Sequence, residues 1–186
     1  MLKRKSLVVA KRKSSLLFVD DLQSVHNYTS KIASSIGARK RTAFNPKEAE
    51  RIISRRLRAV ESLLSKLTKQ VALEKDPSSR KALLKKITYL KGLKRNPFDL
   101  IVSDVNMPHG NAVGDKFALS VRKRFPSQKI LMHSDDQAAL DYLREKGIDY
   151  SVKRNQHDNE KELKVRIQQE LWPKKFKRKL KDEDWF

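Results

Sequence analysis

The 186-residue chain contains no cysteine, which excludes disulfide bonds and thiolate metal sites. No apolar run approaches the roughly 18 residues that a membrane span needs. The apolar stretch at 7–10 is too short for the hydrophobic region of a signal peptide. A glycine-rich phosphate loop, a nucleophile elbow and an HExxH motif are also missing. We therefore expect a soluble, cytoplasmic protein that binds no membrane and is not an enzyme.

The composition combines few apolar residues with many charged ones. Hydrophobic residues make up 38% of the chain and charged residues 35%, which is below and above the usual values for a compact domain. At this length the chain can form one ordinary domain plus a substantial addition. We expect a normal core that carries highly solvated extra parts.

The formal net charge of +21 is concentrated in three segments. Residues 1–13 carry six Lys/Arg and no acid, residues 39–95 carry eighteen Lys/Arg against five Asp/Glu, and residues 172–186 carry six against three. The remaining segments, 14–38 and 96–171, are nearly neutral, with thirteen basic and fourteen acidic residues. This segregation is typical of a docking surface for a polyanion.

Short apolar runs alternate with segments of helical periodicity. The runs at 16–19, 98–102 and 129–132 predict buried strands, because continuous apolar runs of this length suit a parallel sheet covered on both faces. Weaker signals place strands at 150–152 and near 41–44. Helices are predicted at about 22–36, 115–125, 136–146 and 158–171, with Gly147 as a helix stop. The alternation predicts an α/β fold, a doubly wound, five-stranded parallel sheet.

The segment 46–95 departs from this alternation. Asn45 and Pro46 suit the cap and first turn of a helix, and Asp76-Pro77 marks a turn and a second helix start. The first helix, roughly 40 Å long at about 1.5 Å per residue, carries a heptad seam, and the second carries a shorter apolar stripe. We predict an antiparallel helical hairpin. Its core residues are Ile53, Leu57, Val60, Leu64, Leu67 and Val71 in the first helix, and Leu83, Leu84, Ile87 and Leu90 in the second.

Acidic residues gather where predicted strands end. Asp20 and Asp21 end the first strand and Asp104 follows the strand at 98–102, which places them at the edge where open α/β sheets bind ligands. Clustered carboxylates repel one another and require a cation. Because their oxygens are hard ligands, Mg²⁺ is the expected ion.

These residues resemble the bacterial response-regulator receiver family. The resemblance is carried by Phe18-Val19-Asp20-Asp21, Asp104-Val105-Asn106-Met107-Pro108, Met132-His133-Ser134 and Gly147-Ile148-Asp149-Tyr150-Ser151-Val152-Lys153. It covers about 14–45 and 96–171, and it implies a flavodoxin-like fold and phosphorelay signal transduction in a two-component system. The implied partner is a cognate histidine kinase or phosphotransfer protein.

The resemblance also implies a role for each site residue. Asp104 would be the phosphoacceptor, and Mg²⁺ would be held by Asp20, Asp21, Asp104 and the backbone carbonyl of Asn106. Ser134 would be the switch hydroxyl, Lys153 would bind the phosphoryl group, and Tyr150 would be the rotating aromatic. Four features differ from the family pattern. Arg154 stands where proline is usual, the loop 108–114 is about two residues longer, Asp135 occupies a position that is usually small, and the segment from Ser134 to Lys153 is short.

Two functions remain open from the sequence. The first is an atypical, stand-alone response regulator whose output is made by protein or nucleic-acid contacts of the basic hairpin and tails. The second is a constitutive DNA- or RNA-binding protein on a receiver-like scaffold with a vestigial pocket. A third option is that the hairpin is a protein interface, because heptad seams often associate between chains. The chain could then form a homodimer through the hairpin or through the receiver face. The candidates for polyanion binding are Arg51, Arg55, Arg56, Arg58, Lys85 and Lys86.

The predicted organisation is a basic N-terminal arm at 1–13, a receiver-like domain at 14–171 with the hairpin inserted at 46–95, and a basic, aromatic tail at 172–186. The tail interleaves lysines with aromatics, which could bind single-stranded nucleic acid or pack back on the core. The four histidines show no metal-ligand spacing, so we interpret them as surface or packing residues. They are His26, His109, His133 and His157.

Overall fold

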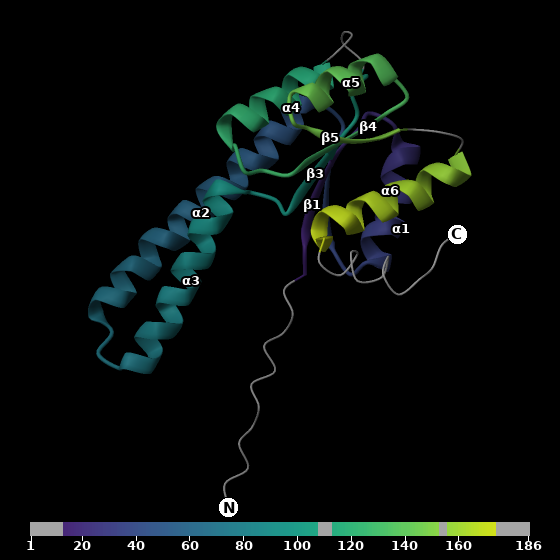
Figure 1. Cartoon of the computed structure of the whole chain (residues 1–186). Coiled ribbons are helices and arrows are strands. Elements are labelled where there is room, and N and C mark those ends of the chain that lie inside the picture. The colour runs from purple at the N-terminus through teal and green to yellow at the C-terminus, as the bar shows by residue number, and fades with distance from the viewer. Residues whose placement is uncertain (1–12, 108–112, 153–155, 174–186) are drawn as a thin grey trace, which may run out of the picture.

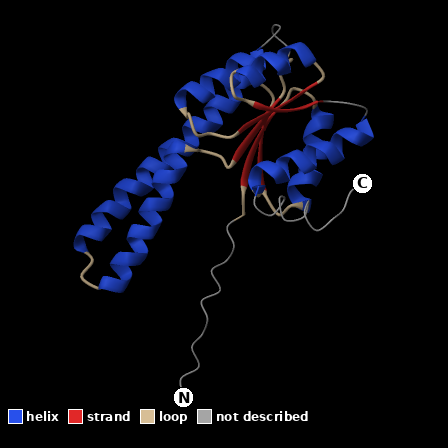
Figure 2. Ribbon diagram, viewed as in Figure 1, coloured by secondary structure: helices blue, strands red, loops and turns tan. Residues whose placement is uncertain are grey.

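The computed structural model describes residues 13–107, 113–152 and 156–173. Five parallel strands form one sheet in the order β2-β1-β3-β4-β5, which confirms the predicted doubly wound α/β class (Figure 2). The strands are β1 (Ser15–Val19), β2 (Arg39–Ala43), β3 (Leu100–Ser103), β4 (Ile130–Ser134) and β5 (Asp149–Val152). All residues of β1, β3 and β4 are buried, as their continuous apolar runs predict.

Helices cover both faces of the sheet (Figure 1). One face packs against α1 (Gln23–Ser35) and α6 (Gln156–Leu171), where Phe18 and Val102 meet Ile32 and Leu163. The other face packs against α4 (Val113–Arg124), α5 (Gln137–Glu145) and the start of α2 (Pro46–Leu73). Within the described ranges, no helix combines the length and apolar character that a membrane span requires.

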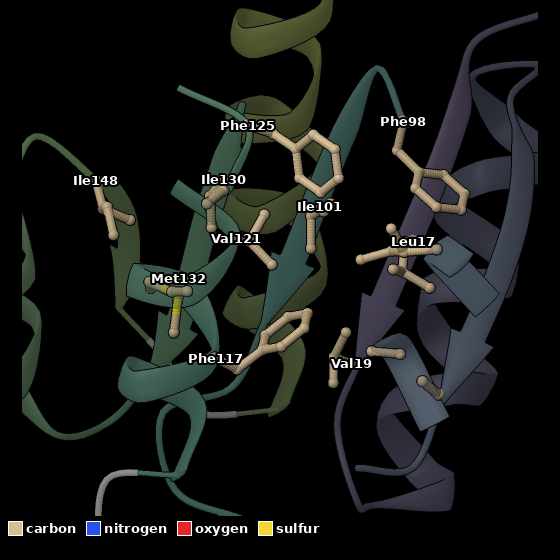
Figure 3. Close-up of a cluster of buried hydrophobic side chains, with 14 of the residues drawn as sticks. Leu17, Val19, Phe98, Ile101, Phe117, Val121, Phe125, Ile130, Met132 and Ile148 are labelled. Carbon is tan, nitrogen blue, oxygen red and sulfur yellow. The ribbon is translucent and has the colours of Figure 1, made fainter. Parts of the chain in front are cut away.

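The core on the second face is the larger of the two. Figure 3 shows part of this core: most of the labelled side chains come from β1, β3, β4 and α4, and Phe98, Phe125 and Ile148 join them from loops. Phe117 and Val121 of α4 are 3% and 4% exposed, and they lie against Ile101 and Met132 of the sheet. The turn after α5 uses Gly147 at a φ of +71°, a conformation that a glycine adopts without steric cost. The predicted helix stop at this glycine is confirmed.

The predicted hairpin is present as α2 and α3 (Pro77–Arg95), which lie side by side and project from the sheet (Figure 1). Asn45 caps α2 by accepting a hydrogen bond from the backbone N–H of Glu48 at 2.9 Å. Asp76 caps α3 in the same way, accepting from the N–H of Ser79 at 2.8 Å. Each helix therefore begins where its Asx-Pro sequence predicts.

The predicted heptad seam is divided between two cores. Ile53 and Leu57 pack into the main core under the sheet, whereas Val60 packs with Leu90 and Leu93 of α3 in a separate, smaller cluster. Leu84, predicted as hairpin core, is 47% exposed, because the buried face of α3 runs through other positions. We call residues 59–95 the arm and the remaining described residues the sheet body.

Candidate functional site

Three aspartates converge at the carboxyl end of the two central strands. Asp20 follows β1 and Asp104 follows β3, and Val19 and Ser103 are register partners in these parallel strands. The backbone N–H of Asp104 donates to the carbonyl of Val19 at 2.9 Å, so strand pairing extends up to the acidic residues. The sequence prediction that the acids share one edge is confirmed.

The carboxylates of Asp20, Asp21 and Asp104 lie close enough to share a metal ion. One oxygen from each lies within 4.8 Å of the others. Among the described residues, no second group of histidines and acids meets this criterion. Two oxygens on opposite sides of one Mg²⁺ are about 4.2 Å apart, because Mg–O distances are about 2.1 Å. The spacing of the triad is therefore compatible with a small, hard cation.

Burial makes this cluster costly without a cation. Asp20 and Asp104 are only 4% and 6% exposed, and Asp21 is half-buried. Backbone donors supply part of the compensation: Asp104 Oδ1 accepts from the N–H groups of Val105 at 2.7 Å and Asn106 at 3.4 Å. These charge-assisted bonds fix the orientation of the carboxylate.

Gly114 is a site residue to which the sequence analysis assigned no role. Its backbone N–H donates to the carbonyl of Val105 at 3.0 Å. A Cβ placed on Gly114 would overlap the carbonyl oxygen of Asp104 and lie 2.8 Å from that of Val105. Only glycine allows α4 to begin this close to the chain that carries Asp104. In the sequence, the available sign of this role was a glycine at the end of the loop that follows β3. The sequence pattern does not show that this glycine approaches the backbone of Asp104.

Ser134 ends β4 and is fully buried. Its hydroxyl accepts from the N–H of Asp136 at 3.3 Å. The N-cap of α5 is Asp136 itself, which accepts from the N–H of Ala139 at 3.0 Å, so Ser134 is not a helix cap. Asp135 is exposed, and Tyr150 of β5 is half-buried against the main core.

Several predicted features lie outside the described residues. They are Lys153 and Arg154 after β5, most of the loop 108–114, the N-terminal arm up to residue 12, and the tail from residue 174. His109 and the side chain of His157 also lie outside them. Trp172 belongs to the described residues and is half-buried.

Two of the histidines predicted as surface or packing residues, His26 and His133, are buried. The imidazole Nε2 of His26 lies 2.7 Å from the carbonyl oxygen of Asp20; since a carbonyl only accepts, this nitrogen carries the proton. Burial lowers the pKa of His26. His133 Nε2 lies 3.2 Å from the hydroxyl of Tyr28. Burial, and then the charges of Asp20 and Asp104, raise the pKa of Tyr28, so that its phenol stays neutral.

The polyanion candidates differ in their surroundings. Arg51, Arg55 and Arg58 are exposed on α2, and Lys85 and Lys86 are exposed on α3. Arg56 is half-buried: its guanidinium lies 4.6 Å from the centre of the Phe98 ring and donates to Ser15 Oγ at 3.2 Å. Arg56 thus has a structural role that the sequence pattern does not reveal.

No family model matches the sequence, and no curated protein matches it. The structural similarity, in contrast, is extensive. A response regulator receiver domain protein from Clostridium thermocellum has a TM-score of 0.56 at 15% identity, with 87% of this chain and 97% of that chain covered.

Two further structures agree. A putative response regulator from Chloroflexus aurantiacus has a TM-score of 0.53 at 21% identity, covering 86% of this chain and 98% of its own. The response regulator TrrA from Thermotoga maritima, solved with Mg²⁺ and BeF, has a TM-score of 0.52 at 21% identity, covering 85% and 99%. The chain therefore has the response-regulator receiver fold, with the α2–α3 helical pair inserted into it.

Proposed function

We propose that this protein is an aspartyl-phosphorylation switch, not an enzyme, and that Asp104 accepts the phosphoryl group. The observation that carries the proposal is the convergence of three carboxylates within 4.8 Å at the ligand-binding edge of a receiver fold. The donor is a phosphohistidine on a histidine kinase or a phosphotransfer protein. This partner is inferred from the fold and from the chemistry of the acceptor.

The transfer needs a positioned nucleophile and little else from the chain. A carboxylate oxygen of Asp104 attacks the phosphorus, a P–O bond forms, and the P–N bond to the donor imidazole breaks with its electron pair leaving on nitrogen. The hydrogen bonds from Val105 and Asn106 hold the carboxylate for this attack. Gly114 keeps the backbone of Asp104 in place from the other side.

The metal site and the switch complete the proposal. Asp20, Asp21, Asp104 and the carbonyl of Asn106 would hold Mg²⁺, which supplies positive charge to offset the charge on the phosphoryl oxygens. By the resemblance, Lys153 adds a second positive charge. Ser134 then moves toward the new dianion and Tyr150 fills the space it leaves, which biases the surface around β4 and β5.

Acetyl phosphate provides a direct test on the full chain. With Mg²⁺ present we expect the intact mass to increase by one phosphoryl group, and Asp104→Asn should abolish the increase. Asp135→Asn is the matched control, because Asp135 is an exposed aspartate one residue beyond Ser134, and it should label as wild type. Failure of wild-type protein to gain mass with a competent donor kinase would contradict the proposal.

The basic segment supports a second candidate, a nucleic-acid-binding protein whose pocket plays no part. Residues 39–95 carry eighteen Lys/Arg against five Asp/Glu, and this segment is the output surface under either candidate. Electrophoretic binding with and without beryllofluoride separates the two. A change in affinity that is absent in Asp104→Asn favours the switch, whereas unchanged affinity favours constitutive binding.

A further inference from the structure

The basic residues of α2 form one exposed stripe. Arg51, Arg55, Arg58, Lys66 and Lys69 are all exposed, and their spacing places them on one side of the helix. Ile53, Leu57 and Val60 are buried on the opposite side. From residue 51 to residue 69 the stripe extends about 27 Å along the helix, at about 1.5 Å per residue. We call these five residues the α2 stripe.

A basic groove adjoins the stripe where α2 meets the edge strand β2. The groove has a volume of about 630 Å³, and Arg55 belongs to both the groove and the stripe. Lys40, Arg41 and Arg56 also line it. The ammonium group of Lys40, however, donates to the carbonyl of His26 at 2.6 Å and to Ser30 Oγ at 2.6 Å. Both partners belong to α1, so the charge of Lys40 lies on the face of the sheet opposite α2, and the basic groups of the groove are Arg41, Arg55 and Arg56.

Two acids of α2 near this surface have partners of their own. Glu48 lines the groove, but its carboxylate accepts from the backbone N–H of Phe44 at 2.8 Å. Glu61 lies on the flank of α2 toward α3 and pairs with Lys94 at 3.0 Å. Arg56 is fixed over Phe98, so one cation of the groove is already ordered. The groove and the stripe together form a continuous positive surface with little local compensation.

We propose that the α2 stripe and the adjoining groove bind the phosphodiester backbone of double-stranded DNA. A regular line of cations complements a regular line of phosphates. The stripe contains no aromatic residue, and Phe98, which lines the groove, is buried beneath Arg56, so the surface lacks the platform on which bases of a single strand would stack. A projecting helix fits the major groove of B-form DNA, whereas the major groove of A-form RNA is too narrow for it. The inference rests on the proposed function only in treating the basic segment 39–95 as the output surface.

The outer face of α3 offers a matched comparison within the same hairpin. Arg80, Lys81 and Arg95 are exposed on α3 and do not line the groove. The variant Arg55→Gln/Arg58→Gln/Lys66→Gln and the control Arg80→Gln/Lys81→Gln/Arg95→Gln each remove two arginines and one lysine. The two variants have the same net charge as each other, and both keep the two basic tails. A difference in their affinity for DNA therefore reports which side of the hairpin binds.

The test is fluorescence anisotropy of the full chain with a labelled DNA duplex at several salt concentrations. We expect the α2 variant to weaken binding at least about tenfold at about 50 mM salt, and to reduce the slope of log K against log salt by about 0.9 per lost phosphate contact. The control variant should change binding by less than about threefold, because only long-range charge is altered.

Three outcomes would overturn the proposal. The first is that wild type does not bind duplex DNA at about 50 mM salt, where phosphate contacts are strongest. The second is that both variants lose the same affinity, and the third is that single-stranded DNA or duplex RNA binds as tightly as duplex DNA. Circular dichroism checks that both variants fold. Acetyl phosphate labelling is measured in parallel, and the α2 variant should label as wild type. The proposed phosphoacceptor can therefore fail or succeed independently of the DNA surface.

Discussion

The sheet body and the arm are stabilised in different ways. The body buries strands between helices on both faces, with two large hydrophobic clusters. The arm has one seam between two helices, with Val60, Ile87, Leu90 and Leu93 as its buried residues. It carries ten Lys/Arg against three Asp/Glu. Most arm residues face solvent, so packing constrains few of them and charged residues can occupy these positions.

The acidic pocket and the basic surface therefore depend on different properties of the chain. In the body, strand pairing places Asp20 and Asp104 side by side, so the site depends on backbone positions held to fractions of an ångström. Along α2, the helix period alone aligns the basic residues of the stripe, so that surface depends on charge. Substitutions that disturb packing should therefore damage the pocket, and those that remove charge from the stripe should damage only the basic surface.

The largest effect is expected at Gly114. Gly114→Ala should destabilise the protein by about 3 kcal/mol or more, because the added methyl overlaps the backbone of Asp104 and the chain must shift to relieve it. Urea unfolding measures this, and acetyl phosphate labelling should fall with it. Gly92→Ala is the control in the arm: its Cβ would meet nothing within 4 Å, and it should stabilise α3 by about 0.5–1 kcal/mol. Equal effects of the two substitutions would contradict the comparison.

A smaller contrast is expected along α2 itself. Ile53→Ala should cost about 3 kcal/mol, since Ile53 is 2% exposed in the main core. Leu64→Ala should cost about 1 kcal/mol, because Leu64 is half-buried in the arm cluster and truncation there leaves no closed cavity. Chemical unfolding of both variants measures the two losses in the free energy of unfolding. A larger loss for Leu64→Ala would mean that the arm, not the body, governs the stability of the hairpin.

The smallest effect concerns pH. Burial lowers the pKa of His26, so between that pKa and the unfolded value of about 6.5 the unfolded chain binds more protons. Stability from this residue is present above about pH 6.5 and is lost as the pH falls through that range. Thermal unfolding in metal-free buffer should show a decrease in the melting temperature of wild type on acidification. The decrease should be smaller in His26→Gln, and an identical pH dependence would contradict a buried, neutral His26.

Much of the body could be predicted from the sequence because burial leaves a clear pattern. Strands β1, β3 and β4 are continuous apolar runs, and the acids that follow them mark the site. The edge strand β2 gave a weak signal, since only Ala43 of its five residues is buried. Phe98 was predicted as strand, but β3 begins at Leu100. An apolar run records burial and not backbone pairing, and Phe98 is buried beneath Arg56.

Other features required three dimensions. The heptad seam predicted one hairpin core, but the helix period cannot tell which partner covers a face, and Ile53 and Leu57 face the sheet. The contact of Gly114 with Asp104 joins residues from different elements, as does the hydrogen bond between His133 and Tyr28. The roles of Ser134, Tyr150 and Lys153 in switching stay predictions, because they concern a second state.

The central claim is that Asp104 is the reactive member of a Mg²⁺-dependent pocket. Borohydride reduction of the full chain after treatment with acetyl phosphate tests it directly, because hydride converts an aspartyl phosphate to homoserine with loss of inorganic phosphate. Peptide mass mapping then locates the product. We expect homoserine at position 104, formed only when Mg²⁺ is present. Homoserine at another aspartate, or formation at position 104 that is equal without Mg²⁺, would contradict it.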